Sequence, residues 1–228
     1  RDSSYINPKI ELGFKDTSSM HFWTSFESSG KNTTITRKYI DSPFIKMPYR
    51  YNYGGAFESK NYSNFAYSLK MNFERGGKNN AWNSDGYKKT WMEAAYGFFP
   101  TDYLTMSIGF SLRDQKEWLK WIDANHLAAY DATEKFLTFN LNYFKGNKHE
   151  LRFKAQFVAV DASNPTSLMS NQNGYLSLSE REVSGFNVGE AAIQIRYKYE
   201  LASLSNLYIV YSQGGNIYEE NINSDSRS

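Results

Sequence analysis

Apolar and polar residues alternate in segments along most of this chain, and the clearest segment covers residues 104–112. Within it, Leu104 and Ile108 occupy one set of alternate positions, and Thr105 and Ser107 occupy the other. Successive side chains of a β-strand point to opposite faces, so this period of two predicts a strand with one apolar and one polar face. The same pattern recurs at residues 65–73, 151–157 and 191–199.

Applied to the whole chain, the pattern predicts an all-β fold with ten strands. They are expected at residues 9–15, 20–28, 49–58, 65–75, 91–99, 104–113, 136–144, 150–159, 190–200 and 207–213. Short connections with turn residues, at 16–19, 59–64, 100–103, 145–149 and 201–206, alternate strictly with long connections at 29–48, 76–90, 114–135 and 160–189. Alternate connections of an antiparallel meander emerge at opposite ends, so one end is expected to carry tight turns and the other long loops.

Strands of this length, with short turns at one end and long loops at the other, are typical of an outer-membrane β-barrel. On the predicted apolar faces Arg75 is the single charged residue, as expected where a charge facing the middle of a bilayer costs about 2–4 kcal/mol. Aromatic residues make up 17% of the chain, and Tyr103, Tyr143 and Tyr49 lie near predicted strand ends, where barrels carry aromatic girdles. The sequence therefore predicts an antiparallel up-and-down transmembrane β-barrel of at least ten strands, part of a larger barrel, surrounded by the lipid of a bacterial outer membrane.

Composition excludes several other classes. The chain has no Cys, which removes disulfides, thiolate metal sites and thiol nucleophiles. Its net charge of +2 gives no reason to expect nucleic acid as a partner. Its apolar runs are far shorter than the ~20 residues of a membrane-spanning helix. Alternation alone does not show whether the apolar face meets lipid or a protein core, so a soluble sandwich or a lipocalin-like barrel remains the alternative.

Several short sequence motifs, most of them in the second half of the chain, form a recognisable set. They are Trp91 to Glu93, Gly97 to Asp102, Tyr130 to Thr133, Leu141 to Phe144, Glu150 to Phe157 and Ile195 to Gly215. This pattern resembles a bacterial outer-membrane barrel family of unknown function, whose members carry an N-terminal domain similar to type-nine carbohydrate-binding modules. The resemblance implies a barrel fold and no catalytic residues.

Two departures from that family bear on the domain organisation. The carbohydrate-binding domain is absent from this chain, and the polar stretch from Asn221 to Ser228 stands where members have a further apolar strand. The resemblance therefore implies that residues 1–228 form a single barrel domain, a C-terminal fragment of a larger protein. A missing N-terminal domain, other chains, and a carbohydrate or other small solute are its expected partners.

The charged residues on the polar faces are the candidate pore-lining groups. They are Lys70, Glu74, Glu93, Arg113, Arg152, Lys154, Arg196 and Lys198. The last four would form a basic strip on neighbouring strands, opposed by glutamates on earlier strands, including Glu58, and such lumen charges tune selectivity. The open alternative is that these residues pair with one another and fill a narrow lumen.

The predicted loop at 114–135 contains three aromatic residues that are candidates for ligand stacking. Trp118, Trp121 and Tyr130 could together form a surface for a sugar or another flat ligand. The alternative is structural, because Trp118, Trp121 and Ile122 have helical spacing, which favours a short helix packed with its Trp side against the barrel.

A catalytic or metal site has little support in the sequence. His126, near Asp123 and Asp131, is the only candidate general base with carboxylates nearby, and no serine is marked out as its partner. The oxygen-rich stretches 179–182 and 223–226 lack the spacing of a calcium loop. No catalytic residue, metal or cofactor is therefore predicted.

Three functions follow, in order of support. The first is a channel or porin-like passage for small hydrophilic solutes, which the resemblance extends to glycan-related ones. The second is a closed barrel that anchors a binding domain in the membrane. The third is a barrel hydrolase centred on His126.

Overall fold

The computed structural model describes residues 3–41, 43–77, 86–146, 148–202 and 205–221, and within these ranges it consists of strands and their connections. No helix long and apolar enough to cross a membrane occurs in this part of the chain. The strands are β1 (Tyr5–Ile6), β2 (Lys9–Gly13), β3 (Ser19–Glu27), β4 (Gly30–Asn32), β5 (Ile45–Met47), β6 (Arg50–Glu58), β7 (Phe65–Gly76), β8 (Lys88–Thr101), β9 (Leu104–Asp123), β10 (His126–Lys145), β11 (His149–Ser170), β12 (Leu176–Leu178), β13 (Gly185–Ala202) and β14 (Ser205–Asn221).

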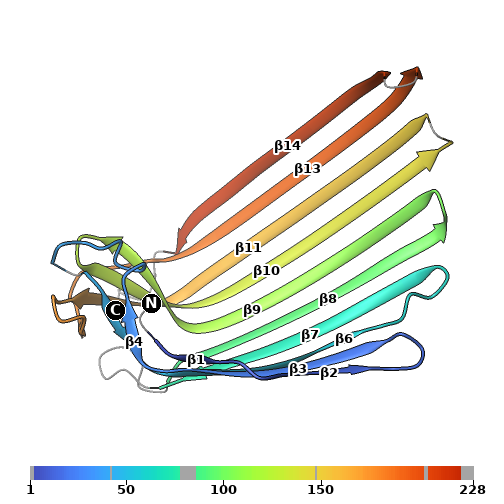
Figure 1. Ribbon diagram of the computed structural model, residues 1–228. Helices are drawn as coiled ribbons and strands as arrows, with labels where there is room; N and C mark the ends of the chain where they lie inside the picture. The colour runs from blue at the N-terminus through green and yellow to red at the C-terminus, as the bar shows by residue number, and fades with distance from the viewer. Residues whose placement is uncertain (1–2, 42, 78–85, 147, 203–204, 222–228) are drawn as a thin grey trace, which may run out of the picture.

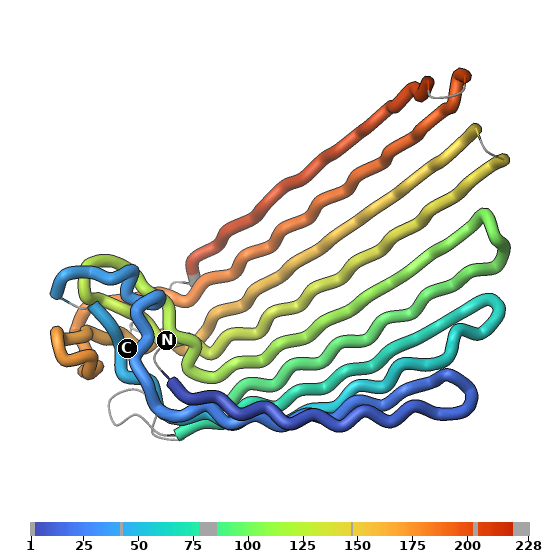
Figure 2. The backbone as a smooth tube through the Cα atoms, viewed as in Figure 1, coloured from blue at the N-terminus to red at the C-terminus, as the bar shows by residue number. Residues whose placement is uncertain are grey.

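Twelve of these strands form one antiparallel sheet, and β4 and β5 form a separate hairpin (Figure 1). Hydrogen-bonded neighbours follow the order β1, β3, β6, β7, β8, β9, β10, β11, β13, β14, while β2 also pairs with β3 and β12 with β11. Each of the ten predicted strands is present, and the sheet is the predicted antiparallel meander. Its layer is broad and curved, with β14 at one edge and β1 and β2 at the other (Figure 2).

Two of the predicted long loops are mostly strand. β9 and β10 have 20 residues each and β11 has 22, so the sheet continues through much of 114–135 and 160–189. A tight turn with Ala124 at φ 40° joins β9 to β10. The expected short helix around Trp118 is therefore wrong. The pairing of β10 shifts by one residue at Glu117 on β9 and at Asn164 on β11, both of which have positive φ. These β-bulges interrupt the period of two, which hid the strands from the sequence pattern.

Beyond these bulges the strand ends form a compact unit, which we call the cap. It consists of β4, β5, β12 and the ends of β9, β10 and β11, and it lies at the left in Figure 1. One buried cluster joins the β4–β5 hairpin to one face of the extended strands, and it contains Ile45, Met47, Leu127, Ala129, Leu168 and Leu176. A second cluster, on the other face, contains Ala128, Tyr130, Ala162 and Phe186. The long connection from β3 to β6 thus packs onto strands far from it in the sequence.

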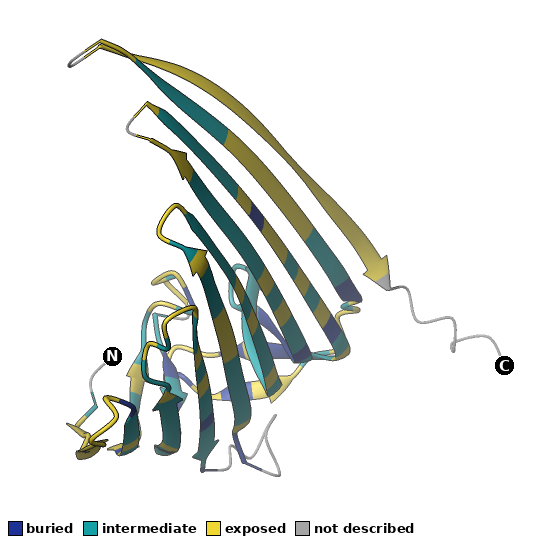
Figure 3. Ribbon diagram, turned by 90° about the vertical axis from the view of Figure 1, so that its right-hand side faces the viewer, coloured by how far each residue is buried: buried dark blue, intermediate teal, exposed yellow. Residues whose placement is uncertain are grey.

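The sheet has an apolar face and a polar face, as the alternation predicts. Large apolar side chains remain exposed on the apolar face, with Leu69 and Phe110 both 46% exposed. Figure 3 shows exposed and less exposed residues alternating along the central strands, and β14 exposed from residue 205 to residue 220. Within the described chain, no second layer of strands or helices covers the exposed face of the central strands.

The apolar face ends at a polar row that crosses six hydrogen-bonded strands. The row consists of Thr90, Asp114, Thr133, Asp161, Asn187 and Glu219. Between this row and the short turns, the apolar face of β9 spans Leu104 to Leu112, and corresponding positions on the neighbouring strands are mostly apolar. Arg75 is the single charge on the apolar faces within the predicted strand bounds, but the longer observed strands add others. Asp114, Asp161 and Glu219 lie in the polar row, and Lys135 lies beside it.

Candidate functional site

The polar face carries a row of paired charges near the long-connection end of β3, β6, β7 and β8. The guanidinium of Arg50 donates to Glu27 Oε2 at 2.7 Å and approaches Glu74 Oε1 at 2.7 Å. Lys89 Nζ lies 4.0 Å from the other oxygen of Glu74. Their side chains are 13–26% exposed. Burial raises the pKa of the neighbouring Tyr87, which keeps its hydroxyl neutral. The predicted pore-lining residue Glu74 is thus neutralised by its neighbours.

Two tryptophans that the sequence analysis did not select lie on the same face. Trp23 Nε1 donates to Asn72 Oδ1 at 2.8 Å, and Trp91 Nε1 donates to the Ser111 hydroxyl at 3.0 Å. A Cβ at Gly54 would lie 2.5 Å from the Trp23 ring, so this ring packs directly on the backbone of β6 and position 54 requires glycine. In the sequence both tryptophans occupy polar positions of their strands, and this exception to the alternation is the signal that could have singled them out.

Lys70 links these aromatic rings to an acidic partner. Its Nζ lies 4.3 Å from the Trp91 ring centroid, 5.8 Å from the Trp23 ring centroid and 3.6 Å from Glu93 Oε2. On the next strands, Arg113 donates to Glu134 at 2.6 Å. The predicted pore-lining residues Lys70, Glu93 and Arg113 therefore all lie on the polar face, each beside a partner of opposite charge, and the expected acidic strip does not stand alone.

The four residues of the predicted basic strip lie on the polar face of β11 and β13, and their pore-lining role stays a prediction. Arg152 and Arg196 are direct cross-strand partners on β11 and β13, and Lys198 lies opposite Glu150. Arg152 pairs with Glu150, and the Arg196 guanidinium lies 4.9 Å from the Tyr208 ring. Within the described ranges, Lys154, Arg196 and Lys198 have no carboxylate within 4.0 Å. The β11–β13 part of the polar face is thus more basic than the β3–β10 part.

A hollow of about 380 Å³ lies on the polar face between β6 and β10. Three rows of cross-strand neighbours line this hollow. Two of them belong to the polar face, one from Glu58 to Thr138 and one from Ala56 to Phe136, and the row between them contributes backbone atoms. Small residues form its floor, while its rim includes Glu58, Lys70, Glu93, Ser111, Phe136 and Thr138. The hollow therefore combines both charge signs, hydroxyls and an aromatic ring.

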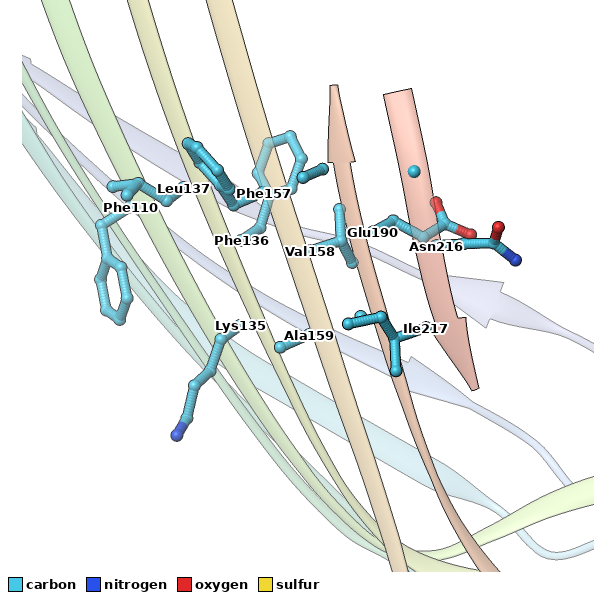
Figure 4. A pocket seen from close by; sticks show the side chains of 13 residues that line it. Phe110, Lys135, Phe136, Leu137, Phe157, Val158, Ala159, Glu190, Asn216 and Ile217 are labelled. Atoms are coloured by element: carbon cyan, nitrogen blue, oxygen red, sulfur yellow. The ribbon is translucent and has the colours of Figure 1, made fainter. Parts of the chain in front are cut away.

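A larger hollow of about 510 Å³ lies on the apolar face of β9 to β14 (Figure 4). Phe110, Leu137, Phe157 and Ile217 surround a shallow floor made by small residues. The floor residues are Ala159, Gly189, Ala191 and Gly215. An adjoining hollow of about 560 Å³ reaches the polar row at Asp161 and Glu219, with Lys135 between the two. This surface is the apolar side of the sheet and is separate from the polar-face site.

The three aromatic residues predicted for ligand stacking do not form one surface. Trp118 and Tyr130 lie in the cap cluster on the side of the polar face, with ring centroids 6.3 and 5.2 Å from that of Phe186. Tyr130 is 3% exposed, so protein already covers it. Trp121 points to the opposite face, where its Nε1 donates to the Ala124 carbonyl and the Arg37 guanidinium lies 4.5 Å from its ring. A three-residue separation places two side chains on opposite faces of a strand.

The carboxylates near His126 are held by other cations. His126 lies opposite Asp123 at the tip of the β9–β10 hairpin, but both Asp123 oxygens accept hydrogen bonds from Arg181, at 2.6 and 2.7 Å. Asp131 accepts hydrogen bonds from Lys116 at 3.0 Å and Asn164 at 3.1 Å. Neither carboxylate hydrogen bonds to the imidazole as an orienting group would.

The bidentate ion pair between Asp123 and Arg181 makes a pH prediction. The hydrogen bonds from Arg181 lower the pKa of the Asp123 carboxyl. A lowered pKa means that the pair is intact at neutral pH and is lost only as the pH falls through that lowered value. We expect Arg181→Gln to raise the Asp123 pKa toward its usual value, measured by NMR titration of the side-chain carboxyl. The Asp131 titration is the internal control, and an unchanged Asp123 titration would contradict the pair.

Ser19, His21 and Glu11 lie together on the polar face, an arrangement that the sequence analysis missed. The Ser19 hydroxyl is 3.1 Å from His21 Nε2, and Glu11 Oε2 is 3.8 Å from His21 Nδ1. Such a row resembles a nucleophile, base and orienting acid, but acyl transfer also needs free N–H donors to stabilise an oxyanion. Ser19 is paired on both sides, with Gly13 and Glu58, so the surrounding backbone belongs to the sheet ladder. The geometry fits a hydrogen-bonded surface row better than a hydrolytic site.

Neither the grouping of possible metal ligands nor comparison with known proteins identifies a chemical activity for this chain. Across the described ranges, no three His, Cys, Asp or Glu residues are grouped so that they could hold a metal ion, and the stretch 223–226 lies outside those ranges. No family model, no curated protein and no solved structure matches this chain.

Proposed function

We propose that this chain forms the barrel wall of a bacterial outer-membrane channel for small hydrophilic solutes. The observation that carries the proposal is the exposed apolar face of a single-layered sheet whose polar face has its own network of ion pairs and hydrogen bonds. In a soluble sandwich, the apolar face is the one that packs against a second sheet. A lipid environment instead satisfies an apolar face without a second layer.

The dimensions of the apolar face support this environment. Nine residues, from Leu104 to Leu112, separate the short-turn end of β9 from the polar row. At about 3.3 Å per residue and a tilt of about 40°, nine residues span roughly 23 Å along the membrane normal, close to the apolar band of about 25 Å in outer-membrane barrels. Aromatic pairs flank the band, with Tyr103 and Tyr143 at one end and Tyr51 and Tyr53 at the other.

Passage of solutes is supported by the chemistry of the polar face. Charged side chains with 38–39% exposure are available there, including Lys70, Glu93 and Arg113, and the basic strip adds further cations. In this proposal the free edge of β14 pairs to complete the wall, either with β1 and β2 or with further strands. The resemblance to the outer-membrane family supports the same location and points to glycan-related solutes.

A closed barrel that anchors a binding domain is the second candidate. The observations that favour it are the mutual pairing of charges across β3 to β10 and the buried cluster of Ala128, Tyr130, Ala162 and Phe186 on the polar-face side of the long-connection end. Both would reduce the free cross-section of a lumen.

Planar-bilayer recordings of the full-length protein separate the two candidates. We expect stepwise conductance that favours anions, because the basic strip lines the lumen in the proposal. Replacing Arg196 and Lys198 together by Gln is expected to reduce the anion preference while leaving conductance steps in place. Absence of any steps from folded protein would contradict the channel and favour the anchor.

A further inference from the structure

We propose that the polar-face hollow around Lys70, Glu93 and Phe136 is a binding site for a sugar ring of a neutral saccharide. The inference rests on the proposed function in one respect, namely that the polar face lines the solute path. The volume of the hollow, about 380 Å³, lies within the range of about 300–1,000 Å³ found for small-molecule sites.

The depth of the hollow comes from residues without long side chains. Ala56, Ala95 and Gly109 form the floor on three strands. A Cβ at Gly109 would lie 2.8 Å from the hydroxyl oxygen of Thr138, so the Thr138 side chain covers this part of the floor and the open part lies at Ala56 and Ala95. A flat ring can therefore approach the sheet over Ala56 and Ala95, whereas longer side chains surround the hollow.

The rim offers hydrogen-bonding groups of both kinds. Lys70 Nζ and Glu93 Oε2 are 3.6 Å apart, and their side chains remain 38% and 39% exposed. Neighbouring hydroxyl groups of a sugar both donate and accept hydrogen bonds, so a cation and a carboxylate side by side match them, and hydrogen bonds to charged groups are stronger than neutral ones. Ser111, the cross-strand neighbour of Glu93, and Thr138 on β10 add hydroxyls to the rim.

Aromatic rings supply the apolar contact that sugars use. Phe136 lies on the polar face between Glu134 and Thr138, which is an unusual place for a side chain with no polar atom. The Trp91 ring lies beside the rim under Lys70. The C–H faces of a sugar ring pack on aromatic faces, in the same way that other amphipathic groups do.

The charge of the hollow selects among saccharides. Glu58 and Glu93 outnumber Lys70 on the rim, so an anionic sugar meets net repulsion. The site therefore fits neutral saccharides better than uronic acids.

Isothermal titration calorimetry on the full chain in detergent micelles tests this site. The ligands are maltose and cellobiose as neutral disaccharides and digalacturonic acid as the anionic one. We expect a neutral disaccharide to bind at least about tenfold more tightly than digalacturonic acid. We expect Ala95→Leu, which fills the floor, to weaken that binding about tenfold or more.

Ala94→Leu is the matched control, because Ala94 and Ala95 are neighbours on β8, both exposed, and point to opposite faces of the sheet. It is expected to leave disaccharide affinity unchanged. The inference is overturned if neither neutral disaccharide binds, if digalacturonic acid binds as tightly, if Ala95→Leu has no effect, or if Ala94→Leu weakens binding equally. Disaccharide binding without bilayer conductance would support the site and contradict the channel, whereas conductance without binding would do the reverse.

Discussion

Replacing Ala94 by Lys is expected to destabilise the protein in phospholipid vesicles by about 2–4 kcal/mol. Ala94 lies on the apolar face of β8, close to the middle of the band, with Leu69 and Phe110 as its cross-strand neighbours. A lysine there must place its ammonium in the hydrocarbon or extend toward the boundary, and both are costly. Reversible urea unfolding in vesicles, followed by tryptophan fluorescence, measures the change in the free energy of unfolding.

Ala95→Lys is the control for this experiment. The starting residue, the substitution and the strand are the same, but the side chain points to the polar face near Glu58 and Glu93. We expect a change within about 0.5 kcal/mol, the usual range for surface substitutions. If Ala94→Lys were as well tolerated as Ala95→Lys, the apolar face would not be in contact with lipid, and the membrane assignment would fail.

Replacing Arg50 by Met is expected to lower the free energy of unfolding by about 2–4 kcal/mol, since removing the shared cation leaves two mostly buried carboxylates with less charge compensation. Arg50 lies between Glu27 and Glu74, at 2.7 Å from each. Without it these carboxylates face each other across β6, with Lys89 at 4.0 Å from Glu74 as the nearest described cation. The Arg50 side chain is 26% exposed, so water reaches this site and replaces only part of the lost interaction energy.

A combined variant distinguishes charge imbalance from lost packing. Arg50→Met together with Glu27→Gln and Glu74→Gln removes all three charges while keeping similar side-chain shapes. We expect it to recover most of the stability that Arg50→Met alone loses, because neutral replacements of a buried ionic group are often nearly as stable as the original. If the triple variant is no more stable than Arg50→Met, packing of the Arg50 side chain is the main contribution.

The sequence predicted the strands well where alternation was uninterrupted. The segments around Ile108, Phe153 and Ile195 are strands in the expected places, because the period of two is a local consequence of strand geometry. It failed at Glu117 and Asn164, where one extra residue reverses the faces that follow. Residues 118–122 have helical spacing in the sequence, but the hydrogen bonds to β10 keep that segment extended.

The candidate site was predicted in part. The charged residues predicted to share one face of the sheet do share it, and Arg152 and Arg196 are register partners because β11 and β13 are hydrogen-bonded neighbours. The role of Trp23 and Trp91 was missed, because each was a single exception in a polar row. Their partners Asn72 and Ser111 lie 49 and 20 residues away in the chain, and only the cross-strand register brings them together.

By itself, the sequence determined the all-β meander and its two unlike faces, since alternation and turn residues act within a few neighbouring residues. The tertiary structure decided which charges neutralise each other, such as Arg50 with Glu27 and Glu74, and how the β4–β5 hairpin packs into the cap. The reason is that register depends on pairing between distant segments, and one bulge changes the face of every residue beyond it.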